Sequence, residues 1–240
     1  MEALIAAGRV SVAGRKASLG DRASVDDRIE IDGRAVTLRP QTAPLRVLLY
    51  HKPVGELVTR HDPGGRATVF DRLPSPRQGR WIAIGRLDLN TSGLLLLTDS
   101  GTLANRMMHP RYEVEREYLV RVLGTLSASA CRRLRQGVVL EDGVAAFARL
   151  EPLRDGAREA ANRWYRVVLR EGRTREVRRM FEAVGAKVSR LMRVRFGSVR
   201  LPRALLAGRW IELDADQCAR LLSKPAEETV RTVVAEENSC

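Results

Sequence analysis

Alternating apolar and polar residues predict two short strands near the N-terminus, Arg9-Val10-Ser11-Val12 and Arg28-Ile29-Glu30-Ile31. The residues before the first strand indicate the end of a helix that stops at Gly8, and Ala13-Gly14 indicates a turn after it. Residues 1–40 are therefore expected to form a small, basic, β-rich unit that is too short to fold well alone.

Residues 41–46 contain Pro44 and lack periodicity, which predicts a linker before a larger domain at 47–223. Apolar patterning in that domain favours strands at 47–51, 81–86, 94–98, 117–123, 137–141, 163–170, 190–196 and 209–213. It favours helices at 101–108, 127–135, 175–184 and 215–222. Because strands outnumber helices without regular alternation, we expect an α+β fold with a mixed, largely antiparallel central sheet and flanking helices. The polar, acidic residues 224–240 are predicted to be a disordered tail.

The charge of the chain points to a polyanionic partner. Lys and Arg number 42 against 29 Asp and Glu, for a net charge of +13, and Arg supplies nearly all of the positive charge. The planar guanidinium suits phosphate and base edges, so nucleic acid is the favoured partner. The alternative is a solvated surface in an arginine-biased sequence. Aromatic residues are 5% of the chain, which argues against a single-strand binder that depends on stacking.

The same composition disfavours several other classes. Cys131, Cys218 and Cys240 lie far apart, and neither they nor the three histidines have the spacing of metal ligands or of a disulfide framework. No secretory signal pattern follows Met1, and the longest apolar run is Leu94 to Leu97. We therefore expect a soluble, cytoplasmic protein without a metal site.

The stretch from Gly85 to Asp99 carries the first candidate chemistry. A strand ends at a charged pair, Arg86 and Asp88, and a polar turn then leads into an apolar run typical of a strand buried on both faces. If the first strand continues, Arg86 shares a face with Asp88, and a guanidinium there would favour the ionised form of a half-buried carboxylate. The residues are equally compatible with a structural ion pair that caps a strand.

Two further segments concentrate arginines. Residues 170–181 contain five arginines around a predicted helix start with Thr174 as N-cap, which favours an anion site over a solvated helix face. In residues 190–197, Arg193 and Arg195 would share one strand face opposite Phe196, so this strand is either an RNA-tracking edge or an ordinary amphipathic surface strand. Tyr118, on a predicted strand, is by itself more typical of a packing residue.

Together these motifs resemble the RsuA-like family of rRNA pseudouridine synthases over nearly the whole chain. The Gly-Arg-Leu-Asp and Thr-Ser-Gly-Leu-Leu-Leu-Leu-Thr sequences at 85–98 resemble the active-site motif of that family. Matches to its other motifs occur at 52–56, 62–66, 117–120 and 173–181, and residues 1–40 resemble an S4 RNA-binding domain. Gly55-Glu56 and the Arg-Glu-Val-Arg-Arg sequence at 175–179 most resemble the branch that modifies 23S rRNA in the peptidyl-transferase region.

The resemblance implies a pseudouridine synthase fold and an isomerase without a cofactor. Asp88 would be the catalytic carboxylate, Tyr118 would pack on the flipped base beside Val177, Arg178 would be the basic partner of Asp88, and Arg86 would help to hold the flipped state. Further RNA-contact candidates are Lys52, Thr91, Ser92, Arg173, Arg175, Arg179, Arg193, Arg195 and, in the first unit, Arg9 and Arg15.

The S4-like segment departs from the family in two ways. The first helix of a typical S4 module would precede Met1, and Ala13-Gly14 stands where an Asn-Gly type of turn is usual. Alanine tolerates positive φ poorly, so we expect a less firm hairpin. The sequence leaves two alternatives open. One is a non-catalytic RNA-binding or ribosome-assembly protein, and the other is a synthase acting on small-subunit rRNA or tRNA. A monomer is expected.

Overall fold

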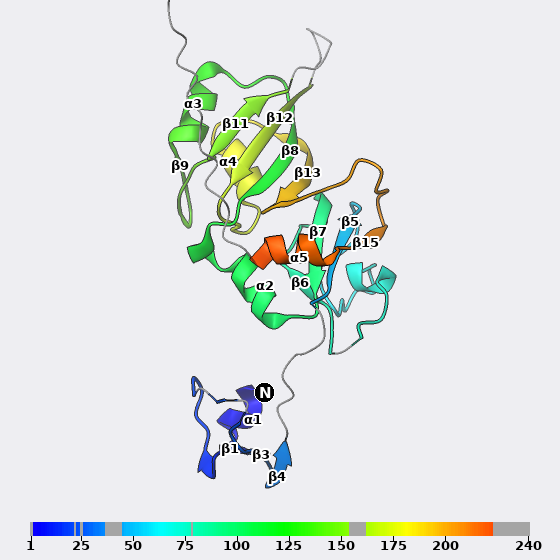
Figure 1. Ribbon diagram of the computed structural model, residues 1–240. Helices are drawn as coiled ribbons and strands as arrows, with labels where there is room; N and C mark the ends of the chain where they lie inside the picture. Colours follow the sequence, from blue (N-terminus) through cyan, green and yellow to red (C-terminus); the bar gives the residue numbers. More distant parts are fainter. Residues whose placement is uncertain are drawn as a thin grey trace, which may run out of the picture. The chain divides into compact units, whose positions relative to one another are not determined.

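The computed structural model describes residues 2–21, 23–24, 26–36, 45–77, 79–153 and 162–222. The chain divides into two compact units, residues 1–44 and 45–240, which are described separately (Figure 1). Most of the predicted linker and all of the predicted tail at 224–240 lie outside the described residues.

The first unit is a short helix and a four-stranded antiparallel sheet of order β2-β1-β3-β4. Its elements are α1 (Glu2–Ala6), β1 (Val10–Val12), β2 (Arg15–Lys16), β3 (Ile29–Ile31) and β4 (Arg34–Val36). Gly8 follows the helix at a φ of 68°, as its predicted role in ending that helix requires. Ala13 and Gly14 have φ of 50° and 76°, so alanine adopts the left-handed conformation that it disfavours. Likeness to an S4 domain stays a prediction.

The second unit is built on a nine-stranded sheet whose main path runs β11-β12-β8-β13-β7-β5-β15, with β14 beside β13 and β6 beside β7 (Figure 1). The β13 strand runs parallel to β7 and antiparallel to β8, so the sheet is mixed and largely antiparallel, as predicted. Its strands are β5 (Val47–Lys52), β6 (Ile82–Ile84), β7 (Ser92–Thr98), β8 (Arg116–Leu123), β11 (Arg149–Pro152), β12 (Asn162–Leu169), β13 (Val188–Phe196), β14 (Val199–Arg200) and β15 (Trp210–Glu212).

Helices cover both faces of this sheet. They are α2 (Gly101–Met108), α3 (Ala128–Gln136), α4 (Glu176–Glu182) and α5 (Ala215–Leu222), with 3-10 turns η1 (Val69–Arg72) and η2 (Pro110–Tyr112). A separate hairpin pairs β9 (Val138–Leu140) with β10 (Gly143–Ala145). Every strand and helix predicted for this unit is present, but the short strands β10, β11 and β14 were not predicted.

The β7 strand accounts for the continuous apolar run of the sequence. Leu95 and Leu97 pack on one face, in the cluster that includes Phe181 of α4. Leu94 and Leu96 pack on the other face, in the cluster that includes Leu103 of α2. All four leucines have no exposed surface. Burial on both sides anchors the loop between β6 and β7, and that loop carries Asp88.

Candidate active site

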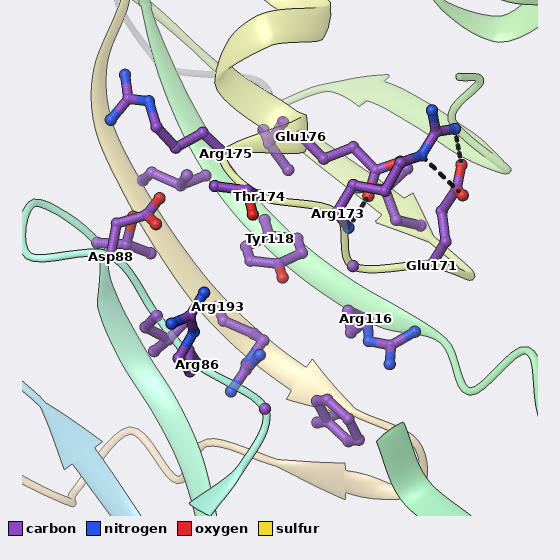
Figure 2. A pocket seen from close by; sticks show the side chains of 18 of the residues that line it. Arg86, Asp88, Arg116, Tyr118, Glu171, Arg173, Thr174, Arg175, Glu176 and Arg193 are labelled. Carbon is purple, nitrogen blue, oxygen red and sulfur yellow. Dashed lines mark hydrogen bonds and ion pairs between the residues drawn. The ribbon is translucent and has the colours of Figure 1, made fainter. Parts of the chain in front are cut away.

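A cavity of about 530 Å³ opens on the second unit. This volume lies within the range of about 300–1,000 Å³ that is usual for ligand sites. Its walls come from the loop between β6 and β7, from β8, from the loop between β12 and α4, and from β13. In Figure 2, Asp88 lies on one side of the cavity, Tyr118 near its middle, and Glu171 with Arg173 on the far side.

The cavity brings together many of the residues that the sequence singled out. The predicted residues that line it are Arg86, Asp88, Thr91, Tyr118, Arg173, Arg175, Val177 and Arg193. Five candidates of the second unit do not line it, namely Lys52, Ser92, Arg178, Arg179 and Arg195, and Arg9 and Arg15 belong to the first unit. Segments separated by more than 100 residues thus meet around Asp88.

Lys52 supports the turn that carries Asp88 through hydrogen bonds to its main chain. Its side chain has no exposed surface, so it is not the RNA contact that the sequence suggested. Its ammonium donates to the main-chain oxygens of Pro53 (2.9 Å), Asp88 (3.2 Å) and Thr91 (2.9 Å). Burial lowers the pKa of Lys52 to about 8, while Glu56 and Asp88 act in the opposite direction. Lys52 therefore positions the turn.

Arg178 is bonded to the same turn, at Asn90. Its Nη2 donates to the main-chain oxygen of Asn90 at 2.9 Å, and its Nη1 donates to that of Val188 at 3.2 Å. The described residues contain no ion pair within 4 Å between Arg178 and Asp88. Burial and the charge of Arg175 lower the pKa of Arg178, and the charge of Asp88 opposes this shift. The predicted partnership is therefore exerted through the backbone of the turn and through a longer-range charge interaction.

Gly55 donates its backbone N–H to the oxygen of Leu89 at 2.9 Å. Together with Lys52 and Arg178, it satisfies every carbonyl from residue 88 to residue 91. A loop whose backbone carbonyls are all bonded is held in one geometry, which suits a catalytic carboxylate.

Lys52→Met is expected to lower the free energy of unfolding by about 2–3 kcal/mol, because buried carbonyl oxygens lose their donor. Turnover should fall as well, since the turn that carries Asp88 loses its support. Chemical denaturation checks the first effect. Lys187→Met, at an exposed lysine, is the matched control and should stay within about 0.5 kcal/mol. Equal stability of the two variants would contradict the positioning role.

Arg86 does not share a strand face with Asp88, contrary to the sequence-based prediction. The β6 strand ends at Ile84, and the residues from 85 to 91 form a loop. Arg86 is exposed and lines the cavity, and no ion pair joins it to Asp88 among the described residues. Arg86 is therefore accessible to solvent at the cavity.

A β-bulge changes which side chains of β13 face the cavity. The register with β8 shifts between Arg193 and Arg195. As a result, Arg193 and Phe196 both line the cavity, whereas Arg195 binds Glu117 and Glu115 at 2.9 Å each. The prediction that Arg193 and Arg195 share one strand face was wrong, because strict alternation does not hold through a bulge.

The predicted anion site before α4 contains acids as well as arginines. Arg173 binds Glu171 at 2.6 Å and Asp142 at 3.1 Å, and Arg179 binds Asp142 at 2.7 Å. The helix begins after Arg175, which has a φ of 51° and gives no side-chain cap, so Thr174 is not the N-cap. Arg173 and Arg179 are thus engaged within the protein, and exposed Arg175 has no ion pair among the described residues.

Glu176 is a buried carboxyl at the end of this network. Its Oε2 accepts the backbone N–H of Arg173 at 3.0 Å. Burial raises the pKa of Glu176 from 4.5 to about 7, and its hydrogen bond with Glu171 acts in the same direction. Arg116, Phe196, Glu171 and Glu176 also line the cavity, and sequence reasoning assigned none of them to the site. Arg116 lies between Glu115 and Glu117 in the sequence, and this alternation of charges does not distinguish it from a surface arginine.

The pKa of Glu176 predicts a pH effect. The folded state holds a proton that the unfolded chain has lost, so stability falls as the pH rises from about 4.5 to about 7. Glu176→Gln should reduce the loss of unfolding free energy between about pH 5 and pH 8 by about 2–3 kcal/mol, measured by urea titration. Glu182→Gln, at an exposed position of α4, should leave the loss as it is. Identical pH profiles for Glu176→Gln and the natural protein would disprove the assignment.

Comparison with known proteins places this site in a family. Residues 46–183 match the family described as RNA pseudouridylate synthase. The chain is 52% identical over 243 residues to the ribosomal large subunit pseudouridine synthase B of Escherichia coli (strain K12). The aligned region covers 99% of this chain and 82% of that protein. The chain belongs to the RNA pseudouridylate synthase family.

Other relatives agree with this assignment. The enzyme of the same name from Vibrio cholerae is 52% identical over 236 residues, or 96% of this chain and 73% of that protein. A crystal structure of a pseudouridylate synthase superposes with a TM-score of 0.65 at 25% identity and covers 92% of this chain and 91% of that one. The pseudouridine synthase fold and the family resemblance are thereby confirmed. The matched segment 46–183 ends before β13, so it contains Asp88, Tyr118 and α4 but not Arg193.

No helix among the described residues is long and apolar enough to cross a membrane.

Proposed function

We propose that this pseudouridine synthase isomerises a uridine of 23S ribosomal RNA, in the peptidyl-transferase region, with Asp88 as the catalytic carboxylate. Support for the RNA target comes from the 52% identity to enzymes named for the large ribosomal subunit. Support for the residue comes from one observation: Asp88 lines the same cavity as Tyr118, on a turn whose carbonyls are all bonded.

The reaction breaks the bond between N1 and C1′, turns the base, and joins C5 to C1′. The uridine must first leave its RNA stack, which costs a few kcal/mol. The exposed arginines at the cavity, Arg86 and Arg175, would offset part of this cost by binding phosphates. Tyr118 would hold the flipped ring by stacking, with Val177 as the apolar contact beside it.

Asp88 has two chemically distinct ways to act. Its carboxylate either adds to C1′ as the base departs, or removes the proton of C2′ to leave a glycal. In both cases the electron pair of the N1–C1′ bond leaves with the base. In both cases Asp88 must be held at one face of the ribose, and the bonded turn provides such support.

The test is tritium release from a 23S rRNA fragment labelled at C5 of uridine, without ATP or added metal. Joining C5 to C1′ expels the C5 hydrogen, so release by the purified protein is expected. Absence of release from the 23S fragment together with release from small-subunit rRNA or tRNA would overturn the target. Salt-sensitive binding without release from any of the three would favour the alternative of a non-catalytic RNA-binding protein.

The proposal includes a monomeric protein in the cytoplasm, where ribosomal RNA is modified. Light scattering of the purified protein measures the first point. A dimer would contradict the monomer without affecting the proposed chemistry.

A further inference from the structure

Arg193 is a buried charge in the wall of the cavity. Only 2% of the residue is exposed, and it lines the cavity together with Asp88 and Tyr118. Its Nε donates to the main-chain oxygen of Leu94 at 2.8 Å, while its Nη2 is buried and makes no hydrogen bond of good geometry among the described residues. The Tyr118 side chain is the neighbouring group that opposes the lowering of the pKa of Arg193 by burial. A buried guanidinium N–H without an acceptor is costly, and one that lines a cavity is available to a ligand.

A second guanidinium lies close by. Arg116 is 6% exposed and lines the same cavity, and its Nη1 donates to the main-chain oxygens of Val114 and Arg170 at 2.9 Å each. The guanidinium carbons of Arg116 and Arg193 lie 5.0 and 4.9 Å from the centroid of Phe196. Figure 2 shows both arginines on one side of Tyr118, whose hydroxyl points toward them.

Neither cation has a carboxylate within ion-pair distance among the described residues, in contrast to Arg173, Arg179 and Arg195. Burial lowers the pKa of both Arg116 and Arg193, and the charge of Arg193 contributes to the shift of Arg116. Guanidinium groups nevertheless stay protonated in proteins. The free energy spent on two buried, unpaired positive charges is recovered when negative charge enters the cavity.

We propose that Arg193 hydrogen-bonds a carbonyl oxygen of the target uracil and, with Arg116 behind it, stabilises the negative charge of the detached base. This inference rests on the proposed function. Breaking the N1–C1′ bond leaves its electron pair on the uracil ring, shared among N1, O2 and O4. The C1′ carbon receives a carboxylate oxygen of Asp88, or Asp88 takes the C2′ proton. When C5 joins C1′, the ring returns the pair and C1′ releases the Asp88 oxygen, or C2′ regains the proton that Asp88 had taken. The ring then loses the C5 proton, so no oxidant or reductant is needed.

A substrate base that carries an electron-withdrawing substituent tests this proposal. Fluorine at C5 withdraws electrons and stabilises the uracil anion, so a fluorinated base depends less on a nearby cation. Arg193→Gln keeps an N–H donor and removes the charge. Single-turnover rates are measured with a 23S rRNA fragment that carries uridine or 5-fluorouridine at the target position. Loss of the starting nucleoside is followed by chromatography and mass spectrometry. Uridine gives its C5-linked isomer, whereas 5-fluorouridine has no C5 proton to lose and gives the C5-linked base with fluorine retained and water added at C6.

Arg193→Gln should slow conversion of uridine by about 10²-fold, as expected for loss of one preorganised charge-stabilising donor. It should slow 5-fluorouridine by about 10-fold or less. Arg195→Gln, on the same strand but paired with Glu115 and Glu117, is the matched control and should change both rates by one common factor. A common factor for Arg193→Gln as well would assign Arg193 a structural role and overturn the proposal.

Loss of the bond to Leu94 could unfold the Arg193 variant, so circular dichroism accompanies each rate. Arg116→Gln then gives an independent measurement, because it removes the second cation and leaves Arg193 in place. Its rate loss should again be larger for uridine than for 5-fluorouridine, and equal losses would overturn the proposal. Inactivity of the natural protein toward both substrates would instead refute the proposed function.

Discussion

Asp88→Asn is expected to lower the single-turnover rate by about 10⁴-fold or more, in line with removal of an essential catalytic group. The amide has the shape of the carboxylate but neither its charge nor its basicity, so it can neither add to C1′ nor take the C2′ proton. The turn is held through backbone oxygens by Lys52 and Arg178, and these bonds do not depend on the Asp88 side chain. Stability and RNA affinity should therefore stay near those of the natural protein.

The measurement is tritium release under single-turnover conditions, with RNA binding measured in parallel. Asp216→Asn makes the same isosteric change at an exposed site in the first turn of α5 and should retain full turnover. Turnover by Asp88→Asn within about 10-fold of the natural rate would exclude Asp88 as nucleophile or base. Loss of both turnover and binding would indicate instead that the substitution disrupts the turn.

Local patterns predicted the elements of the second unit because each depends on residues close in sequence. The apolar run of β7 indicated burial on both faces, and Leu94 and Leu95 do pack in separate clusters. The polar turn that follows Asp88 was also predicted, since a polar turn between two strands is a local signal. The contacts of Asp88 were not, because Lys52, Gly55 and Arg178 reach the turn from distant segments.

Irregular backbone caused the clearest error. Period-two alternation placed Phe196 opposite Arg193, whereas the bulge puts both side chains at the cavity. A bulge inserts one residue into a strand and leaves no reliable mark in a single sequence. The sequence also marked Arg173 and Arg179 as candidates for RNA contact, although Asp142, more than 30 residues away, binds both. Charge counts predict a basic protein, but they do not tell which arginines remain available for RNA.

Gly93→Ala is expected to destabilise the second unit by about 4 kcal/mol or more, a loss typical of severe steric conflict in a core. Gly93 is where β7 and β13 run parallel, opposite Arg193. A Cβ there would lie 2.2 Å from the main-chain oxygen and 2.7 Å from the nitrogen of Arg193, and its φ of 105° is one that alanine disfavours. Relief requires the two strands to separate, which displaces Arg193 from the cavity wall.

Gly143→Ala separates strain from steric conflict. Gly143 has a φ of 113°, close to that of Gly93, but its nearest neighbour would be 3.8 Å from the new Cβ. Backbone strain should cost about 1–3 kcal/mol at both positions, so the excess at Gly93 measures the clash between the strands. Urea denaturation gives the two free energies. If a folded fraction of Gly93→Ala remains, its turnover should be lower than that of Gly143→Ala, because Arg193 moves while Asp88 keeps its own supports. Equal stability and equal turnover in the two variants would show that β7 and β13 can part without cost, and that the close approach at Gly93 does not place Arg193.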